Sequence, residues 1–210
     1  MNMLGLAALV TGSRALGNEL LHDRRGLAAV EFAIILPIVL VLFFGTVEFS
    51  SGISEYRKVT LVAHTLSDLT SQTTTSVTDV GLSNYFAASS SIVTPYDVTP
   101  IKPTISELYV DNNKVAKVQW SKSATVTMSS GSPQVALQTS GHNVGDVVAI
   151  PATLATPGTF LIWSEVSYVY TPSVGYVMGK TGISLKDQSY TRPRFTTCVD
   201  YPQANSCALH

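Results

Sequence analysis

The sequence predicts an α+β protein in which a long N-terminal membrane-spanning helix precedes an extracytoplasmic domain with an antiparallel sheet. The stretch from Leu27 to Val47 is apolar and long enough to cross a bilayer core, which needs about 20 residues. From Phe49 to about Thr70, apolar residues recur every three or four positions, as in an amphipathic helix. From Ile105 onward the period changes to two, which is typical of half-buried strands.

These patterns divide the chain into three parts. Residues 1–26 form a cytoplasmic leader, residues 27–70 a transmembrane helix with an amphipathic extension, and residues 71–210 an extracytoplasmic α+β domain. The total of 210 residues suits one domain with an anchor. Ser50-Ser51-Gly52 leaves open a break between a membrane helix and a separate second helix.

The charges around the apolar stretch predict its orientation. Arg14, Arg24 and Arg25 precede it, and basic residues favour the cytoplasmic side. We therefore expect a single pass with the N-terminus in the cytoplasm. The apolar core is longer than the 7–15 residues of a secretory signal peptide, and no clean cleavage site follows it, so a conventional cleaved signal is the weaker interpretation.

Glu31 is the unusual residue of this stretch, because it places a carboxylate inside an apolar segment. A charged side chain near the bilayer centre costs roughly 2.5–3.5 kcal/mol on insertion scales. Two interpretations follow. Glu31 either reaches the nearby cytoplasmic interface with no further role, or it is compensated by a group on another molecule.

The remaining chain predicts a short helix and about four strands. Ser71–Thr78 is a loop, and the expected turn between the first two strands is Asp111-Asn112-Asn113. Along the second strand, Ala116, Val118 and Trp120 are expected on one face. The short helix is Asp79–Ser89, and the strands are Ile105–Val110, Lys114–Lys122, Phe160–Tyr170 and Ile183–Phe195. Ser129–Gly158 is rich in turn residues and offers at most a short strand or edge near residues 145–151.

The composition argues against several functional classes. A formal net charge of −1 gives no basic field for nucleic acid. The four histidines have no metal-ligand spacing with one another or with cysteine; they are His22, His64, His142 and His210. Gly179-Lys180-Thr181 is not a P-loop, because Val174 stands where the motif requires glycine. We expect no enzyme activity, no metal and no cofactor.

Cys198 and Cys207 are the two cysteines of the chain. In an oxidising compartment they would close a small disulfide loop. The other interpretation is a pair of unrelated buried thiols.

Two stretches resemble a known family. Basic residues, Gly26 and then an apolar segment with Glu31 at its fifth position resemble a type IV prepilin processing signal. The sequence Ala29-Val30-Glu31-Phe32-Ala33, followed by Leu36-Pro37 and Glu48-Phe49, resembles that of the TadE/TadG-like pilus assembly proteins of tight-adherence (type IVb) pili. Trp163–Pro172 and Tyr190–Arg194 resemble the C-terminal half of proteins in that group.

The resemblance implies a pilin-like fold and a processing route. A prepilin peptidase would cut after Gly26, and Leu27 would become the new N-terminus. The Glu31 carboxylate would then pair with the free α-amino group of a neighbouring subunit. The leader is long and has an apolar patch of its own, unlike many such leaders, so both a cleaved protein and a permanent full-length anchor stay open.

The resemblance also implies a place and partners. The chain would sit in the bacterial inner membrane, with its C-terminal domain in the periplasm, beside other pilus assembly proteins and pilin subunits. The expected function is that of a pseudopilin-like component that acts by helix packing. The alternative is an unprocessed membrane-anchored periplasmic binding or adhesion module, and the fate of residues 1–26 separates the two.

Overall fold

The computed structural model describes residues 25–172, 182–202 and 207. It divides into two compact units, Met1–Val47 and Glu48–His210, called here the first and the second unit. A long helix, α2 (Arg25–Ser71), contributes residues to both. A long apolar N-terminal helix followed by an antiparallel sheet confirms the predicted α+β class.

Helix α2 is continuous over 47 residues and includes Pro37. It also runs through Ser50-Ser51-Gly52, so the break left open by the sequence is not found. In the second unit, Val59, Val62, Ala63 and Leu66 are fully or almost fully buried. Their spacing of three and four residues explains this burial, because such residues share one helix face.

A second helix, α3 (Asp79–Ser90), follows a loop and leads into a 3-10 turn, η1 (Ser91–Val93). Thr78 caps its N-terminus, since its Oγ1 accepts a hydrogen bond of 3.2 Å from the Gly81 amide. Leu82 and Phe86, four residues apart, are both buried. The short helix predicted from Asp79 is therefore present.

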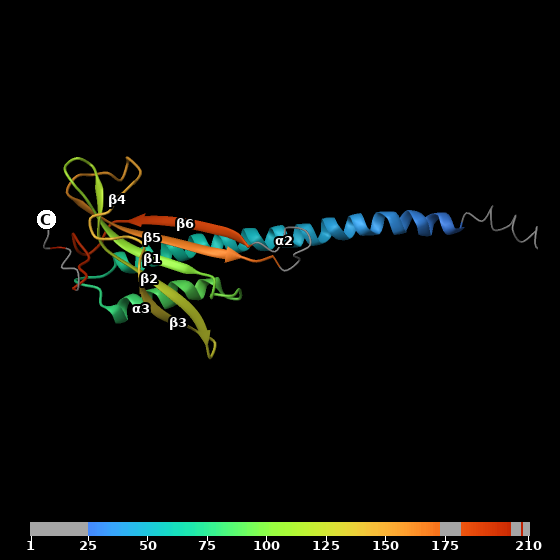
Figure 1. The fold of residues 1–210 in the computed structure, drawn as a ribbon, viewed down its shortest axis with the longest axis horizontal. Helices are drawn as coiled ribbons and strands as arrows, with labels where there is room; N and C mark the ends of the chain where they lie inside the picture. Colours follow the sequence, from blue (N-terminus) through green and yellow to red (C-terminus); the bar gives the residue numbers. More distant parts are fainter. Residues whose placement is uncertain (1–24, 173–181, 203–206, 208–210) are drawn as a thin grey trace, which may run out of the picture. The chain divides into compact units, whose positions relative to one another are not determined.

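Within the described residues the sheet has six strands, which corrects the prediction of about four. The order is β3-β2-β1-β5-β6, and β4 pairs separately with β2 (Figure 1). All described pairs are antiparallel. The strands are β1 (Lys102–Val110), β2 (Ala116–Ser129), β3 (Ser132–Thr139), β4 (Val147–Val148), β5 (Thr159–Tyr170) and β6 (Ile183–Thr191).

Strand β3 lies in the stretch that the sequence analysis gave to turns. It continues from β2 through a tight turn at Ser130 and Gly131, both of which have positive φ. Pro133 is tolerated because β3 is an edge strand. At the other edge, β6 ends at Thr191 and does not reach Phe195, since Pro193 cannot donate to a ladder.

The hairpin between β1 and β2 forms as predicted. Asp111 Oδ1 accepts hydrogen bonds from the amides of Asn113 (2.9 Å) and Val115 (3.0 Å). A register shift follows along the pair, because Glu107 lies opposite Trp120 while Leu108 lies opposite Val118. This bulge turns Trp120 to the opposite face from Val118, so the predicted shared face of Ala116, Val118 and Trp120 is wrong.

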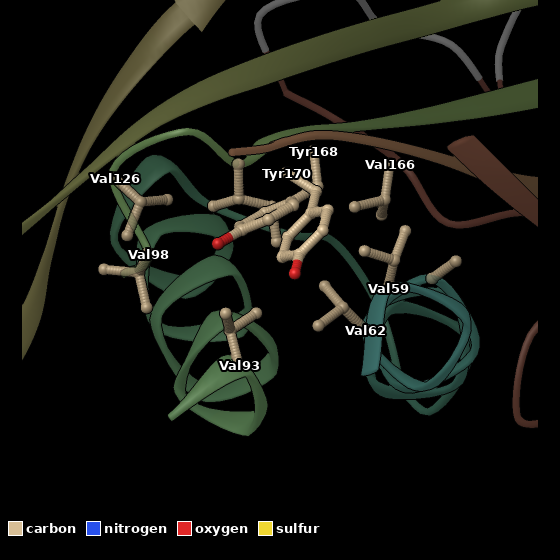
Figure 2. Packing of buried hydrophobic residues seen from close by; sticks show 10 residues of the cluster. Val59, Val62, Val93, Val98, Val126, Val166, Tyr168 and Tyr170 are labelled. Carbon is tan, nitrogen blue, oxygen red and sulfur yellow. The ribbon is translucent and has the colours of Figure 1, made fainter. Parts of the chain in front are cut away.

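The second unit is held together by buried clusters on both faces of the sheet. On one face, Val59 and Val62 of α2 meet Val166, Tyr168 and Tyr170 of β5 (Figure 2). On the same face, Leu66 and α3 cover Ile105, Trp120 and Ile162. On the other face, the connection from β3 to β5 packs over Leu108, Val118, Leu161 and Trp163. Each large buried side chain contributes about 1.5–3 kcal/mol.

Candidate functional site

The residues predicted for processing lie at the start of α2. Gly26 and Leu27 are exposed, Leu27 by 59%. A Cβ placed on Gly26 would meet no atom within 4 Å, and the same holds for Gly45. A glycine inside a helix costs about 1 kcal/mol relative to alanine. No packing within the described residues therefore requires these two glycines.

The Glu31 side chain is exposed on the same segment. No hydrogen bond or ion pair joins it to a residue that the structure describes. Its neighbours along the helix are apolar and exposed, with Val30 at 57% and Phe32 at 64%. Over residues 26–47, Glu31 is thus the one charged side chain on a surface that is apolar apart from Thr46.

The exposed apolar surface extends along the whole of this segment. The large side chains from Leu27 to Val47 are exposed by 39% or more. By length and composition, α2 is the one described helix that is long and apolar enough to cross a membrane. In water such a surface would be strongly unfavourable, so a lipid or protein environment is the one in which it is stable.

The second unit holds a buried carboxylate that the sequence analysis missed. Glu107 is fully buried. Its Oε1 accepts a hydrogen bond of 2.7 Å from the Val199 amide, and its Oε2 accepts one of 3.1 Å from the Trp120 indole. The alternation of Ile105, Glu107 and Tyr109 along β1 was the signal that could have placed it on an inward face.

The surroundings of Glu107 change its acidity. Burial raises its pKa from 4.5 to about 8, although the bonds from Val199 and Trp120 act in the opposite direction. The same indole donates a second hydrogen bond of 2.8 Å to the Val199 carbonyl. Glu107 and Trp120 thus fasten the C-terminal segment around Val199 to the sheet.

Cys198 and Cys207 form a disulfide bond in the structure. Their sulfurs and a Glu107 carboxylate oxygen lie within 4.8 Å of one another. Three such groups resemble a metal-ligand set, but a metal requires thiolates and the disulfide leaves none. The cluster therefore serves to fix the C-terminal segment beside Glu107.

A polar groove lies on the sheet face away from α2 and α3. It has a volume of about 590 Å³, with Lys102 and Lys186 on opposite sides of Ser167. Glu165 lies in this groove, and its Oε2 is 2.6 Å from His142 Nε2. The centroid of the His142 ring also lies 4.8 Å from that of the Trp163 ring. His142, which lies between β3 and β4, is thus held against the sheet.

A second histidine contacts a serine. His64 Nδ1 and Ser189 Oγ are 2.9 Å apart, and Ser67 Oγ lies 3.0 Å from the same serine oxygen. Ser189 and Ser67 are both buried. These hydroxyl groups join β6 to α2, and no carboxylate bonded to His64 completes a catalytic triad among the described residues. Gly179-Lys180-Thr181, His22 and His210 lie outside the described residues.

Comparison with known protein families finds a match for the N-terminal part of the chain. Residues 26–66 match the family described as TadE-like protein. Neither the curated proteins nor the solved structures contain a match to the chain. The matched segment includes Gly26, Leu27 and Glu31 and extends into the second unit as far as Leu66. The predicted resemblance is thereby confirmed for the N-terminal stretch: residues 26–66 are similar to the TadE-like family. The match does not extend to Trp163–Pro172 or Tyr190–Arg194, whose resemblance stays a prediction.

Proposed function

We propose that this chain is a pseudopilin-like membrane component of a tight-adherence (type IVb) pilus assembly or secretion system. It acts by packing its N-terminal helix against other subunits. The observation that carries the proposal is Glu31, five positions after Gly26 in a TadE-like segment, on an apolar helix surface where no described residue binds it. A pilus assembly system lies in a membrane and contains other helical subunits, so it provides both the lipid and the partner helices that such a surface requires.

The first step of the proposal is insertion. Residues 27–47 cross the bacterial inner membrane once, with residues 1–26 as a cytoplasmic leader and the sheet domain in the periplasm. The exposed apolar side chains of this segment support that placement. The disulfide between Cys198 and Cys207 also suits an oxidising compartment.

The second step is processing by a prepilin peptidase after Gly26. Glycine offers no side chain to obstruct an enzyme, and the open space around Gly26 means that packing among the described residues does not explain its presence. Cleavage would leave Leu27 with a free α-amino group close to Glu31 in sequence.

The third step is pairing between subunits. A carboxylate in an apolar surrounding is strongly destabilised unless an opposite charge accompanies it. The α-amino group of a neighbouring Leu27 would supply that charge and fix the register between two helices. Small residues at Ala28, Ala29, Ala33 and Gly45 would let the helices approach closely.

The experiment is N-terminal sequencing of the protein from its native membrane, with a strain lacking the prepilin peptidase as control. A chain that begins at Leu27, and only when the peptidase is present, is the expected result. Replacement of the carboxylate by Glu31→Ala should then abolish assembly, whereas the neighbouring Val30→Ala should not. Normal pili with Glu31→Ala would refute the pairing role.

One observation favours the alternative function, an unprocessed anchored module that binds a periplasmic partner or surface. The groove beside Lys102, Glu165 and Lys186 is open and polar, and the described chain does not fill it. An intact N-terminus in the sequencing experiment would favour this alternative, and the groove would then be the surface to test.

A further inference from the structure

The exposed surface of α2 stays free of charged side chains past Val47, where the apolar stretch ends. After Glu31, the next charged residues in the sequence are Glu48 and Glu55. Both are buried in the second unit, with exposures of 4% and 5%. The Tyr170 hydroxyl donates a hydrogen bond to the Glu48 carboxylate. This bond holds the carboxylate in the interior of the second unit. The first exposed charge after Glu31 is Arg57.

In place of charges, this part of the second unit exposes apolar and aromatic side chains. Phe49 is 63% exposed, Ile53 41%, Tyr56 45% and Ile183 of β6 42%. They surround a groove of about 250 Å³ whose accessible lining is almost wholly apolar. The patch belongs to the second unit alone, so a membrane helix by itself does not explain it.

The length of helix from Leu27 to Tyr56, over which Glu31 is the one exposed charged side chain, fits a whole bilayer. At 1.5 Å per residue, the helix rises about 30 Å over residues 27–47, which equals the hydrocarbon core. Up to Tyr56 it rises about 45 Å, which equals the bilayer with its headgroup zones, roughly 40–45 Å thick. Aromatic rings such as those of Phe49 and Tyr56 are enriched in these zones.

We infer that Phe49, Ile53, Tyr56 and Ile183 form a lipid-contact surface by which the second unit lies in the headgroup zone of the membrane. The occupant is the phospholipid leaflet into which α2 emerges. The inference rests on the membrane anchoring contained in the proposed function. It adds that the folded domain itself, and not only its helix, contacts lipid.

The test is tryptophan fluorescence of the full chain in vesicles of phosphatidylethanolamine and phosphatidylglycerol. Phe49→Trp and Tyr56→Trp report on the patch, and Phe43→Trp reports on the membrane segment. Phe195→Trp, at a site that is 68% exposed beyond β6, is the matched aromatic control. The native Trp120 and Trp163 are buried and give a constant background. Two quenchers are compared: lipids brominated near the headgroup, and aqueous iodide.

The expected result is strong quenching of the new fluorescence in Phe49→Trp and Tyr56→Trp by brominated lipid and weak quenching by iodide. Phe195→Trp should show the reverse. Iodide quenching of the patch variants equal to that of Phe195→Trp would overturn the inference, as would protection from both quenchers, which would indicate a second protein copy. If Phe43→Trp alone is quenched by lipid, the anchor stands and the inference fails; if Phe43→Trp is open to iodide, both fail.

Discussion

The two halves of α2 have the same secondary structure but different surroundings. In residues 27–47 apolar residues occur on every side of the helix, and the large ones are exposed. In residues 48–71 they recur at three and four positions, and Val59, Val62 and Leu66 are buried against the sheet domain. The comparison shows that the arrangement of apolar residues, more than their number, indicates whether a helix faces lipid or a protein core.

The two units also differ in the surroundings that each gives to a carboxylate. Glu107 of the second unit is buried but accepts hydrogen bonds from Val199 and Trp120. Glu31 of the first unit is exposed among apolar side chains and has no partner in the described part of the chain. Glu107 is thus satisfied by its own fold, whereas any partner of Glu31 has to come from outside the described residues.

The largest expected effect separates the two halves of α2 directly. Leu66→Ala should lower the free energy of unfolding of the second unit by about 2–5 kcal/mol, because it leaves a cavity in a fully packed core. Leu40→Ala, at a side chain that is 43% exposed, should leave that free energy nearly unchanged. The measurement is denaturant unfolding of the full chain in detergent micelles, followed by the fluorescence of Trp120 and Trp163. Equal losses for both variants would contradict the comparison.

A second prediction sharpens the contrast between the carboxylates through pH. The pKa of Glu107 is about 8 in the folded protein and near its ordinary value of 4.5 when unfolded. Between these values the folded state holds more protons, so stability should decrease as pH rises from about 4.5 to about 8 and then level off. The decrease should amount to a few kcal/mol, at about 1.4 kcal/mol per full pKa unit.

Glu107→Gln should reduce this dependence, because the amide does not titrate. A smaller slope should remain from Glu55, whose pKa is raised to about 7 by burial and by the nearby Glu48. Glu31→Gln is the matched control and should leave the unfolding of the second unit unchanged, since Glu31 belongs to the first unit. Unfolding curves at a series of pH values check both. An undiminished slope in Glu107→Gln would contradict the role assigned to Glu107.

The patterns that could be predicted from the sequence are local and regular. The apolar run after Leu27, the helical period up to about Thr70 and the strong strand Phe160–Tyr170 each repeat a signal over many residues, and the structure has a helix or strand there. The Asp111-Asn112-Asn113 turn was equally predictable, because the Asp111 side chain accepts a hydrogen bond from the backbone amide of Asn113 within the same turn.

The features that were missed depend on the partner strand or on distant segments. Strand β3 contains Pro133 and lies in a stretch rich in turn residues, so the short alternation of Val135 and Leu137 with more polar positions was not recognised as a strand, and its pairing with β2 decides its conformation. The bulge that separates Val118 from Trp120 is set by the β1–β2 register. The hydrogen bonds of Glu107 come partly from Val199, far away in sequence. The roles predicted for Gly26, Leu27 and Glu31 concern other molecules, so they stay predictions.

The smallest expected effect compares two hydroxyl groups on α2. Ser67 is fully buried, and its Oγ lies 3.0 Å from Ser189 of β6. Thr46 donates only within the helix, to the Leu42 carbonyl at 2.8 Å. Ser67→Ala should therefore cost the second unit about 1 kcal/mol, and Thr46→Ala close to nothing in the same unfolding assay. A cost for Thr46→Ala as large as that for Ser67→Ala would show that the first half of α2 contributes to the stability of the second unit, and the two halves would then not be independent.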